Sequence, residues 1–228
     1  MVDLTASTQS DLAELVNASV AKSGEVIAAE FQSNGRGRLD RTFEAPPQSA
    51  LLFSFYIAPK RAVSDWGFIS FLAALAMREV ITDQLAEKVN LKWPNDILIG
   101  DKKVAGLLAQ QIGEGVIVGI GLNVAMSTDE LPVPTATSLL LADSNLLDRN
   151  LILSAFLNHF ENLFKEWDSG GDFLEKYRQV CSTLGRQVRV EVLGRDSIEG
   201  EAVSITAQGV LILKDGTEVN VGDVVHLR

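Results

Sequence analysis

The sequence predicts an α+β fold in residues 1–183, followed by a small all-β barrel in residues 184–228. Two long segments, 66–85 and 149–167, carry apolar residues at helical spacing. Short apolar runs bounded by glycine, proline and aspartate are typical of strands. From Gly185 onward the chain changes to close-spaced short strands and tight turns. A chain of 228 residues that is 46% hydrophobic and 22% charged can bury cores of this size.

Each element of the larger domain follows from a local pattern. Ser7 and Thr8 are helix-capping residue types and stand before apolar residues at helical spacing. Pro94 ends a strand because it cannot donate to a sheet ladder. A turn at Gly100-Asp101 separates two further strands. After the first helix we expect strands at 25–31, 50–58, 89–93, 97–99, 104–112 and 116–123, and helices at 66–85, 149–167 and 172–183.

The C-terminal module is predicted from alternation and turn chemistry. Val188, Val190 and Val192 alternate with charged residues, as in a strand with one buried face. Residues 214–217 contain an Asp-Gly pair and predict a hairpin turn.

Composition excludes several classes of protein. The formal net charge of −10 and the isoelectric point near 4.7 disfavour a general DNA or RNA binder. A single cysteine, Cys181, cannot form an internal disulfide. The N-terminus lacks the features of a signal peptide, and apolar runs are too short for a membrane span. We therefore expect a cytoplasmic protein with no DNA and no membrane partner.

Familiar catalytic motifs are absent. The sequence contains neither a Walker-type phosphate loop nor a G-x-S-x-G elbow. Its two histidines, His159 and His226, fall in different predicted modules. We assign neither of them a catalytic role, so any chemistry must use other groups.

The loop from Gly35 to Arg41 is the first candidate site. Its glycines let the backbone approach a ligand, and its three arginines suit carboxylate or phosphate oxygens. The arginines repel one another unless an anion lies among them. The same composition also fits a solvated turn that binds nothing, and this segment alone does not decide between the two.

Three strand-end segments add candidates. Lys92 and Asp96 flank Pro94 and could meet phosphate and Mg²⁺, although Asp96 could equally cap a turn. Lys103 opens an apolar strand and could be held at the rim of a pocket. The segment from Gly119 to Asn123 ends a strand with two glycines and an amide that could read adenine, or forms a β-bulge.

Together and in this order, these segments resemble the biotin–protein ligases, the biotin–[acetyl-CoA-carboxylase] ligases. The matching segments cover nearly the whole chain: Ser7-Thr8, Gln32, 35–41, 92–96, 103–106 and 119–123. The resemblance implies a mixed-sheet catalytic domain of the biotin/lipoate ligase type in residues 1–183 and an SH3-like β domain in residues 184–228. It also implies an ATP-dependent, AMP-forming ligase that makes biotinyl-5′-AMP and then biotinylates a lysine of a biotin carboxyl carrier domain.

The resemblance also assigns roles to individual residues. The catalytic residues would be Lys103, Arg38 and Arg41. Biotin would contact Ser7, Thr8, Gln9, Gln32, Arg36, Gly37, Arg38, Lys103 and Gly106. ATP would contact Arg38, Arg41, Phe43, Lys92, Asn95 and Asn123, while Asp96 would hold Mg²⁺. Two departures stand out: Gln9 replaces the family's asparagine, and Phe43 stands where many members have tryptophan.

Further expectations concern partners and rivals. Only six residues precede Ser7, so we expect a ligase without the repressor domain of some relatives, acting as a monomer or weak homodimer. A lipoate– or octanoate–protein ligase is the nearest rival, and a non-catalytic binding protein is a rival of another class. We expect the loop from Gly35 to Arg41 to be mobile when empty and ordered by ligand.

Overall fold

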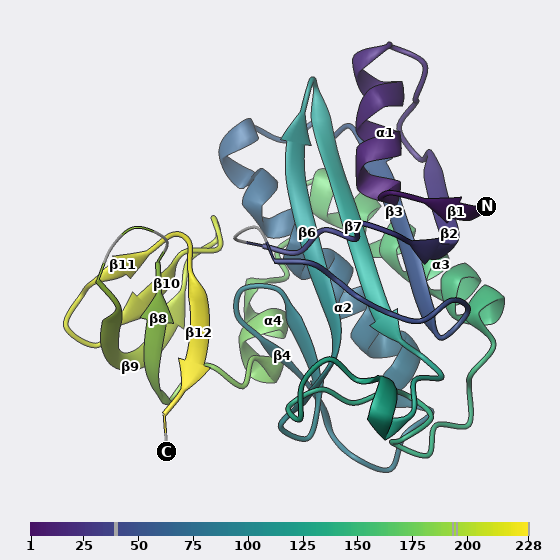
Figure 1. Ribbon diagram of the computed structural model, residues 1–228. Coiled ribbons are helices and arrows are strands. Elements are labelled where there is room, and N and C mark those ends of the chain that lie inside the picture. Colours follow the sequence, from purple (N-terminus) through teal and green to yellow (C-terminus); the bar gives the residue numbers. More distant parts are fainter. Residues whose placement is uncertain (39–40, 193, 195, 228) are drawn as a thin grey trace.

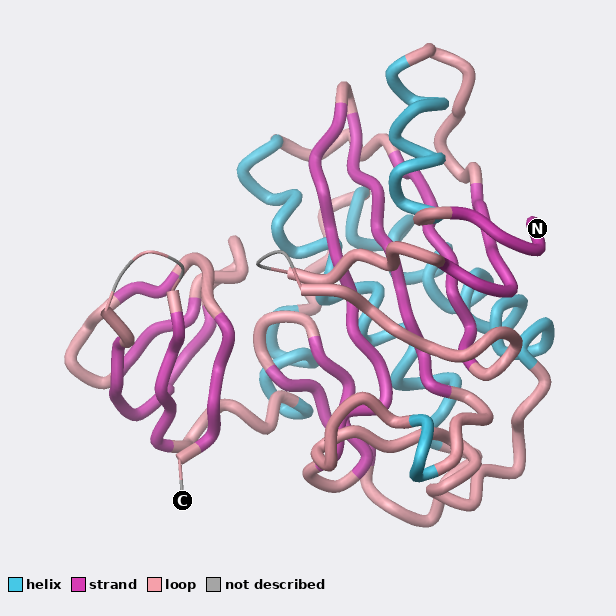
Figure 2. The backbone as a smooth tube through the Cα atoms, in the orientation of Figure 1, coloured by secondary structure: helices cyan, strands magenta, loops and turns pink. Residues whose placement is uncertain are grey.

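A computed structural model describes residues 1–38, 41–192, 194 and 196–227. Its larger part is built on a seven-stranded sheet of order β1-β2-β3-β7-β6-β5-β4 (Figures 1 and 2). Only the β1–β2 pair is parallel, so the sheet is mixed, as predicted. The strands are β1 (Val2–Thr5), β2 (Val26–Gln32), β3 (Ala50–Ile57), β4 (Val89–Lys92), β5 (Asp96–Ile99), β6 (Lys102–Ile112) and β7 (Gly115–Asn123).

Helices cover both faces of this sheet (Figure 1). Helix α1 (Thr8–Asn17) lies on one face, where Leu12 packs with Tyr56 of β3. Helices α2 (Ile69–Thr82) and α3 (Arg149–Asp168) lie on the other face. Every residue of β3 is buried, because successive side chains point to opposite faces and both faces are covered.

The apolar stripe of α3 is core, as its spacing predicts. Phe156 meets Phe53 edge-on with ring centroids 5.2 Å apart, and Phe160 meets Phe55 at 4.6 Å. Such aromatic pairs each add about 0.5–1.5 kcal/mol beyond burial of their area. The helix begins where the side chain of Asp148 accepts hydrogen bonds from two first-turn amides. Packing and capping together place α3 against the centre of the sheet.

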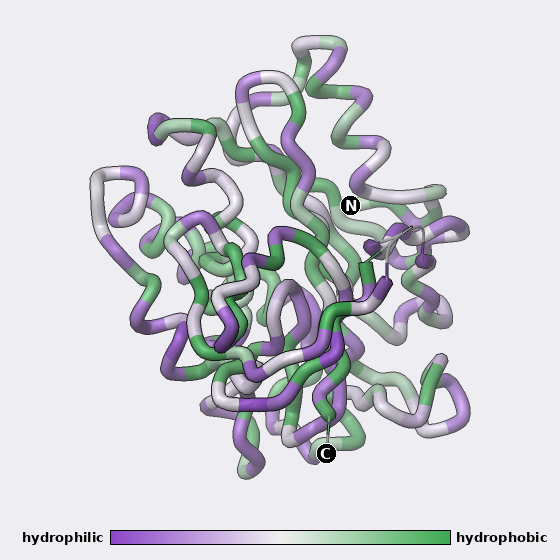
Figure 3. Tube along the Cα trace, turned by 90° about the vertical axis from the view of Figure 1, so that its left-hand side faces the viewer, coloured by the Kyte–Doolittle hydropathy of each residue, from purple (hydrophilic) through white to green (hydrophobic). Residues whose placement is uncertain are grey.

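The C-terminal module is a second, five-stranded antiparallel sheet of order β11-β10-β9-β8-β12. Its strands are β8 (Gln187–Glu191), β9 (Ile198–Ile205), β10 (Leu211–Leu213), β11 (Glu218–Val219) and β12 (Asp223–His226). Along β8 the valines alternate with polar residues, and hydrophilic and hydrophobic residues are interspersed through the module (Figure 3). The predicted hairpin is confirmed: Leu213 donates to Thr217 O, and Gly216 has a φ of 88°.

The predicted closed barrel needs correction. In the part of the module that the structure describes, the outer strands β11 and β12 are not paired with each other. Strand β11 has only two residues, too few to carry a ladder around to the opposite edge. The module is therefore an open sheet.

Polar contacts join the two sheets. The indole Nε1 of Trp93, just after β4, donates to Gly209 O at 2.8 Å. Arg178 of α4 (Leu174–Val180) donates to Ile205 O and to Ser204 Oγ. One continuous hydrophobic cluster contains buried side chains of both sheets. The C-terminal sheet thus packs beside the end of β4.

Boundaries differ from expectation in places where packing is weak. Strand β1 was not predicted, because it has only four residues and these are mostly exposed. The helix expected at 66–85 is a 3₁₀ turn, η1 (Val63–Phe68), followed by α2. A second 3₁₀ turn, η2, spans Thr128–Glu130. In the described residues, no helix is both long and apolar enough to cross a membrane.

Candidate active site

A cavity of about 270 Å³ opens on the sheet face that carries α1 and extends to the C-terminal sheet. Its size is near the lower end of the range for small-molecule sites. All but one of the predicted site residues line it: Ser7, Thr8, Gln9, Gln32, Arg36, Gly37, Arg38, Arg41, Phe43, Lys92, Asn95, Asp96, Lys103 and Gly106. Residues far apart in the sequence therefore meet at one site.

One end of the cavity is neutral and polar. We call Ser7, Thr8, Gln9, Gln32 and Ser54 the polar pocket. The backbone amide and hydroxyl of Thr8 donate to Gln32 Oε1 at 2.8 and 3.0 Å, and the Thr8 hydroxyl lies 2.8 Å from that of Ser54. These bonds fix the pocket wall before any ligand arrives.

Gln9 is the exception within the polar pocket. Its side chain is 3% exposed, and its Nε2 has no hydrogen-bond partner in the structure. A buried donor without a partner costs about 1–3 kcal/mol. Such a cost at a cavity wall indicates a ligand that supplies an acceptor.

The glycines of β7 make room for side chains of the site. A Cβ at Gly119 would lie 2.2 Å from Gln9 Oε1, and one at Gly121 would lie 2.6 Å from the ring of Phe43. The pairing of β7 with both neighbours runs through these positions without a register shift. The alternative of a β-bulge is therefore wrong, and the two glycines seat Gln9 and Phe43 against the strand.

The loop from Gly35 to Arg41, which we call the arginine loop, has two antiparallel arms that lie close together. Gly37 N donates to Arg41 O at 2.7 Å, and Phe43 N donates to Gly35 O at 2.9 Å. A Cβ at Gly35 would lie 2.3 Å from Phe43 O, so this close approach requires glycine. Both arms cross in front of β6 and β7 toward the C-terminal sheet (Figure 1). Leu39 and Asp40, which belong to the predicted loop, lie outside the described residues.

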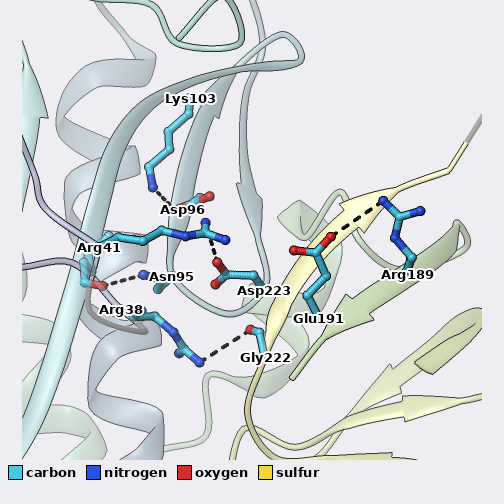
Figure 4. Close-up of polar contacts among 10 residues, drawn as sticks. Arg38, Arg41, Asn95, Asp96, Lys103, Arg189, Glu191, Gly222 and Asp223 are labelled. Carbon is cyan, nitrogen blue, oxygen red and sulfur yellow. Dashed lines mark hydrogen bonds and ion pairs between the residues drawn. The ribbon is translucent and has the colours of Figure 1, made fainter. Parts of the chain in front are cut away.

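The other end of the cavity is charged. We call Arg38, Arg41, Lys92 and Lys103 the cation cluster. Lys103 Nζ lies 2.5 Å from Asp96 Oδ1, and its side chain runs over Gly106, whose added Cβ would come within 3.1 Å of Nζ. Figure 4 shows Lys103 and Asp96 facing each other. Gly106 thus leaves space for this lysine.

The C-terminal sheet completes the charged end. Arg41 Nη1 lies 2.5 Å from Asp223 Oδ2, and Arg38 donates to Gly222 O at 3.5 Å (Figure 4). Glu191 also lines the cavity, and its carboxylate lies 3.6 Å from Arg189. The loop and β12 are therefore in direct contact.

Burial makes two of these cations poorly solvated. Burial lowers the pKa of Arg38, an effect that Asp223 and Asp96 oppose. Burial likewise lowers the pKa of Lys92; Asp96 opposes this, and nearby Lys103 adds to it. The cavity lining holds five lysines and arginines against three carboxylates, in a chain of net charge −10. An entering anion would relieve this local excess of positive charge.

The fit to a magnesium ion rests on Asp96. Within the described residues, no three or more histidine, cysteine or acidic side chains cluster as metal ligands. Asp96 lines the cavity beside the cation cluster and so offers a carboxylate to a shared ion. Mg²⁺ bound through one or two carboxylates usually takes further ligands from substrate phosphates. The residues present fit a Mg²⁺ ion that would be shared between the Asp96 carboxylate and substrate phosphates.

Asn95 and Asn123 are placed differently. The amide of Asn95 donates to Leu107 O at 2.6 Å and so ties the start of β5 to β6 beside the cavity. Asn123 is absent from the cavity lining, and its buried amide donates to Thr137 O at 2.9 Å. Its contact with adenine therefore stays a prediction.

Sequence reasoning missed several lining residues, among them Ser54 and Asp223, which make polar contacts in the site. Ser54 is a lone hydroxyl in an otherwise apolar strand, a signal that could have marked it. Asp223 follows a glycine in what the sequence presents as an ordinary turn. Nothing local to it reports the tertiary contact with Arg41.

Comparison with known proteins places this site in a family. The model described as "Biotin/lipoate A/B protein ligase family" matches residues 1–127, and "Biotin protein ligase C terminal domain" matches residues 183–227. Biotin–[acetyl-CoA-carboxylase] ligase of Mycobacterium tuberculosis is 36% identical, with 100% of this chain and 88% of that protein covered. The bifunctional ligase/repressor BirA of Bacillus subtilis is 30% identical over 93% of this chain and 68% of that protein.

A solved structure agrees along the whole length. The biotin protein ligase from Aquifex aeolicus in complex with biotin and ATP has a TM-score of 0.81 and 27% identity, covering 100% of this chain and 97% of that one. Sequence, fold and cavity lining thus lead to one assignment: this chain belongs to the biotin/lipoate A/B protein ligase family.

Proposed function

We propose that this protein is a biotin–protein ligase that activates biotin with ATP and transfers it to a lysine of a biotin carboxyl carrier domain. The observation that carries the proposal is one cavity with a neutral polar pocket at one end and the cation cluster at the other. A urea-like ring suits the first end, and phosphates suit the second. The names of the relatives support biotin as the acid.

The polar pocket would hold the ureido ring. The unpartnered Nε2 of Gln9 and the hydroxyl group of Ser7 can donate to the ureido oxygen. The Thr8 hydroxyl, whose hydrogen is donated to Gln32 Oε1, can accept from a ureido N–H. Gln32 Oε1 already accepts two bonds from Thr8, so its own amide hydrogens remain for ligand. Gln9 would thus take the place of the family's asparagine.

The cation cluster would bring two anions together. In the first step, an oxygen of the biotin carboxylate forms a bond to the α-phosphorus of ATP, and the bond to the β-phosphate oxygen breaks. Lys103 would neutralise the carboxylate and the transferring phosphoryl oxygens, with Arg38 and Arg41 on the phosphates. Arg36 and Gly37 would cover the biotin tail, and pyrophosphate would leave.

The second step needs no catalytic side chain that forms a covalent bond. The amine of the carrier lysine attacks the acyl carbon of biotinyl-5′-AMP, AMP leaves with the bonding electrons, and the nitrogen loses a proton. The absence of a serine, cysteine or histidine nucleophile from the proposed catalytic set is consistent with this route.

The remaining nucleotide contacts are part of the same proposal. Phe43, whose ring packs over Gly121, would stack on the adenylate. Lys92 and Asn95 would lie along the phosphates. Asp96 would hold Mg²⁺, which supplies charge neutralisation at the phosphates when bound. We divide the chain at residues 183 and 184 into a catalytic domain and a C-terminal domain. We also propose a cytoplasmic monomer or weak homodimer, where ATP and carrier are available.

Biotin-dependent exchange of labelled pyrophosphate into ATP tests the first step. We expect exchange with biotin and none with lipoate or octanoate. A second assay with a biotin carboxyl carrier domain should show AMP formation matched by biotin attached to lysine. Exchange driven by lipoate would reassign the acid, and biotin binding without labelling of any carrier domain would favour a non-catalytic binding protein.

A further inference from the structure

The contact between the arginine loop and β12 uses a cation that the proposed function also requires for phosphate. Arg41 is one of the cations proposed to bind phosphate, yet its guanidinium already has a carboxylate partner, Asp223, at 2.5 Å. The Asp223 side chain is 17% exposed, whereas that of Arg41 is 63% exposed. The anion thus lies in the wall of the cavity with little exposure, whereas the cation is largely exposed to solvent. Figure 4 shows the two side chains facing each other.

We propose that Asp223 is a positioning residue that occupies the place of a phosphate on Arg41 until ATP arrives, and again after pyrophosphate leaves. The inference rests on the proposed function for the identity of the anion. ATP would exchange the Arg41–Asp223 ion pair for an Arg41–phosphate pair, so its binding energy is reduced by the pair it breaks. Pyrophosphate binding would be reduced by the same factor, which favours product release.

Geometry supports an exchange rather than a permanent structural bond. Asp223 opens strand β12, whose ladder with β8 holds it in place through four residue pairs. On the loop side the contacts are two long side chains, Arg41 to Asp223 and Arg38 to Gly222 O at 3.5 Å. An ion pair with one largely exposed partner contributes little, equivalent to at most about a fivefold change in affinity. Phosphates carrying several charges can displace it.

Glu191 is an internal comparison for Asp223, because its carboxylate lines the same cavity from the same sheet. Its carboxylate lies 3.6 Å from Arg189 and is not paired with any loop residue that the structure describes, whereas that of Asp223 is paired with Arg41. Neutralising either residue removes one negative charge from the cavity. Only neutralisation of Asp223 removes the specific partner of the loop.

Titration with inorganic tripolyphosphate in the absence of biotin tests the proposal directly. The variant Asp223→Asn should bind tripolyphosphate roughly 2- to 5-fold more tightly than the wild type, as expected for removal of a competing ion pair. Glu191→Gln should show a smaller gain. Glu201→Gln, which breaks the pair with Lys214 outside the cavity, should show none.

Steady-state kinetics provide a second, independent measurement of phosphate binding. In Asp223→Asn, the KM for ATP and the inhibition constant for pyrophosphate should fall together, while the KM for biotin stays unchanged. Trypsin should cut after Arg36 or Arg38 faster in the ligand-free variant, because the loop has lost its anchor. A circular dichroism spectrum and melting curve matched to the wild type confirm folding.

The outcomes separate this inference from the proposed function. If tripolyphosphate binds the variant no more tightly, or equally tightly in Glu191→Gln, Asp223 does not compete for Arg41 and the inference fails. If the variant binds tripolyphosphate more tightly but the wild type lacks biotin-dependent exchange, the positioning role stands and the proposed ligase activity is wrong.

Discussion

The two ends of the cavity differ in burial, in charge and in how their side chains are held. The polar pocket is buried and neutral, and hydrogen bonds among Thr8, Gln32 and Ser54 hold it in shape. The cation cluster is partly exposed, and two of its members, Arg41 and Lys103, are paired with carboxylates from β12 and β5. A neutral ligand end needs preformed geometry, because each hydrogen bond contributes only about 1 kcal/mol. A charged reaction centre needs cations that can change partners.

Replacement of Lys103 should have the largest effect, because it removes a charge where the transferring phosphoryl group must lie. We expect Lys103→Met to slow biotin-dependent pyrophosphate exchange by about 10²–10³-fold, the usual cost of losing one such donor. The KM for biotin should rise much less. Lys102→Met is the matched control, since Lys102 is the adjacent, exposed lysine. Equal losses in both variants would show that Lys103 acts only through general charge.

A smaller effect is expected at the neutral end. Replacing Gln9 by methionine keeps the length of the side chain but removes the unpartnered Nε2. The KM for biotin should rise about tenfold, the value of one hydrogen bond to ligand, with the KM for ATP unchanged. The melting temperature should rise, since a buried donor without a partner is gone.

Gly119→Ala should reproduce the kinetic part of this result, because its Cβ would lie 2.2 Å from Gln9 Oε1 and displace that amide. Ser10→Ala, on the same helix and outside the cavity lining, is the control. A Gln9→Met protein that is more stable and binds biotin normally would remove Gln9 from the site. The neutral end would then depend on Thr8 and Gln32.

The same contrast explains what the sequence could predict. Strands such as 50–58 and the stripe of α3 were predictable, because apolar periodicity is a local signal. The loop arginines and Lys103 were predictable as chemistry, because their residue types and order resemble a known family. The role of Gly119 and Gly121 was not, since it depends on Gln9 and Phe43, which lie far away in the chain.

Contacts between the modules were the least predictable. Asp223 lies 182 positions after Arg41, and Gly209 lies 116 positions after Trp93, so nothing in a local window links them. The charged end of the cavity combines a local pair, Asp96–Lys103, with the long-range pair Arg41–Asp223, whereas much of the polar pocket comes from residues 7–32. This is why the open C-terminal sheet and its part in the site emerged only from the structure.

The smallest expected effect concerns His226, which links the C-terminal sheet to the charged end. Its Nε2 lies 3.2 Å from Thr183 Oγ1, and that hydroxyl accepts from the Trp93 amide at 3.0 Å. The pKa of His226 is lowered to about 4, chiefly by burial and also by the positive charges of Lys92 and Arg186, while Asp101 opposes the shift. The unfolded chain should titrate near pH 6.5.

The native protein therefore keeps His226 neutral where the unfolded chain takes up a proton. The stability that neutral His226 contributes is fully present above about pH 6.5. It is lost as the pH falls toward about 4, where the native histidine also protonates. Because the side chain is only half-buried, we expect a loss of about 1–2 kcal/mol over this range. Urea unfolding of wild type and His226→Gln at pH 7.5 and 5 measures it as a difference, which cancels the carboxylates common to both.

The variant should show a shallower fall between these two pH values. His159→Gln is the matched control, because His159 lies half-exposed on α3 beside Glu79 and far in sequence from the charged end. Parallel pH curves for wild type and His226→Gln would mean that the histidine is solvated in the native state. The bond through Thr183 to Trp93 would then contribute nothing to holding the C-terminal sheet against the cation cluster, and the charged end would depend on the Arg41–Asp223 pair and the packing around Trp93.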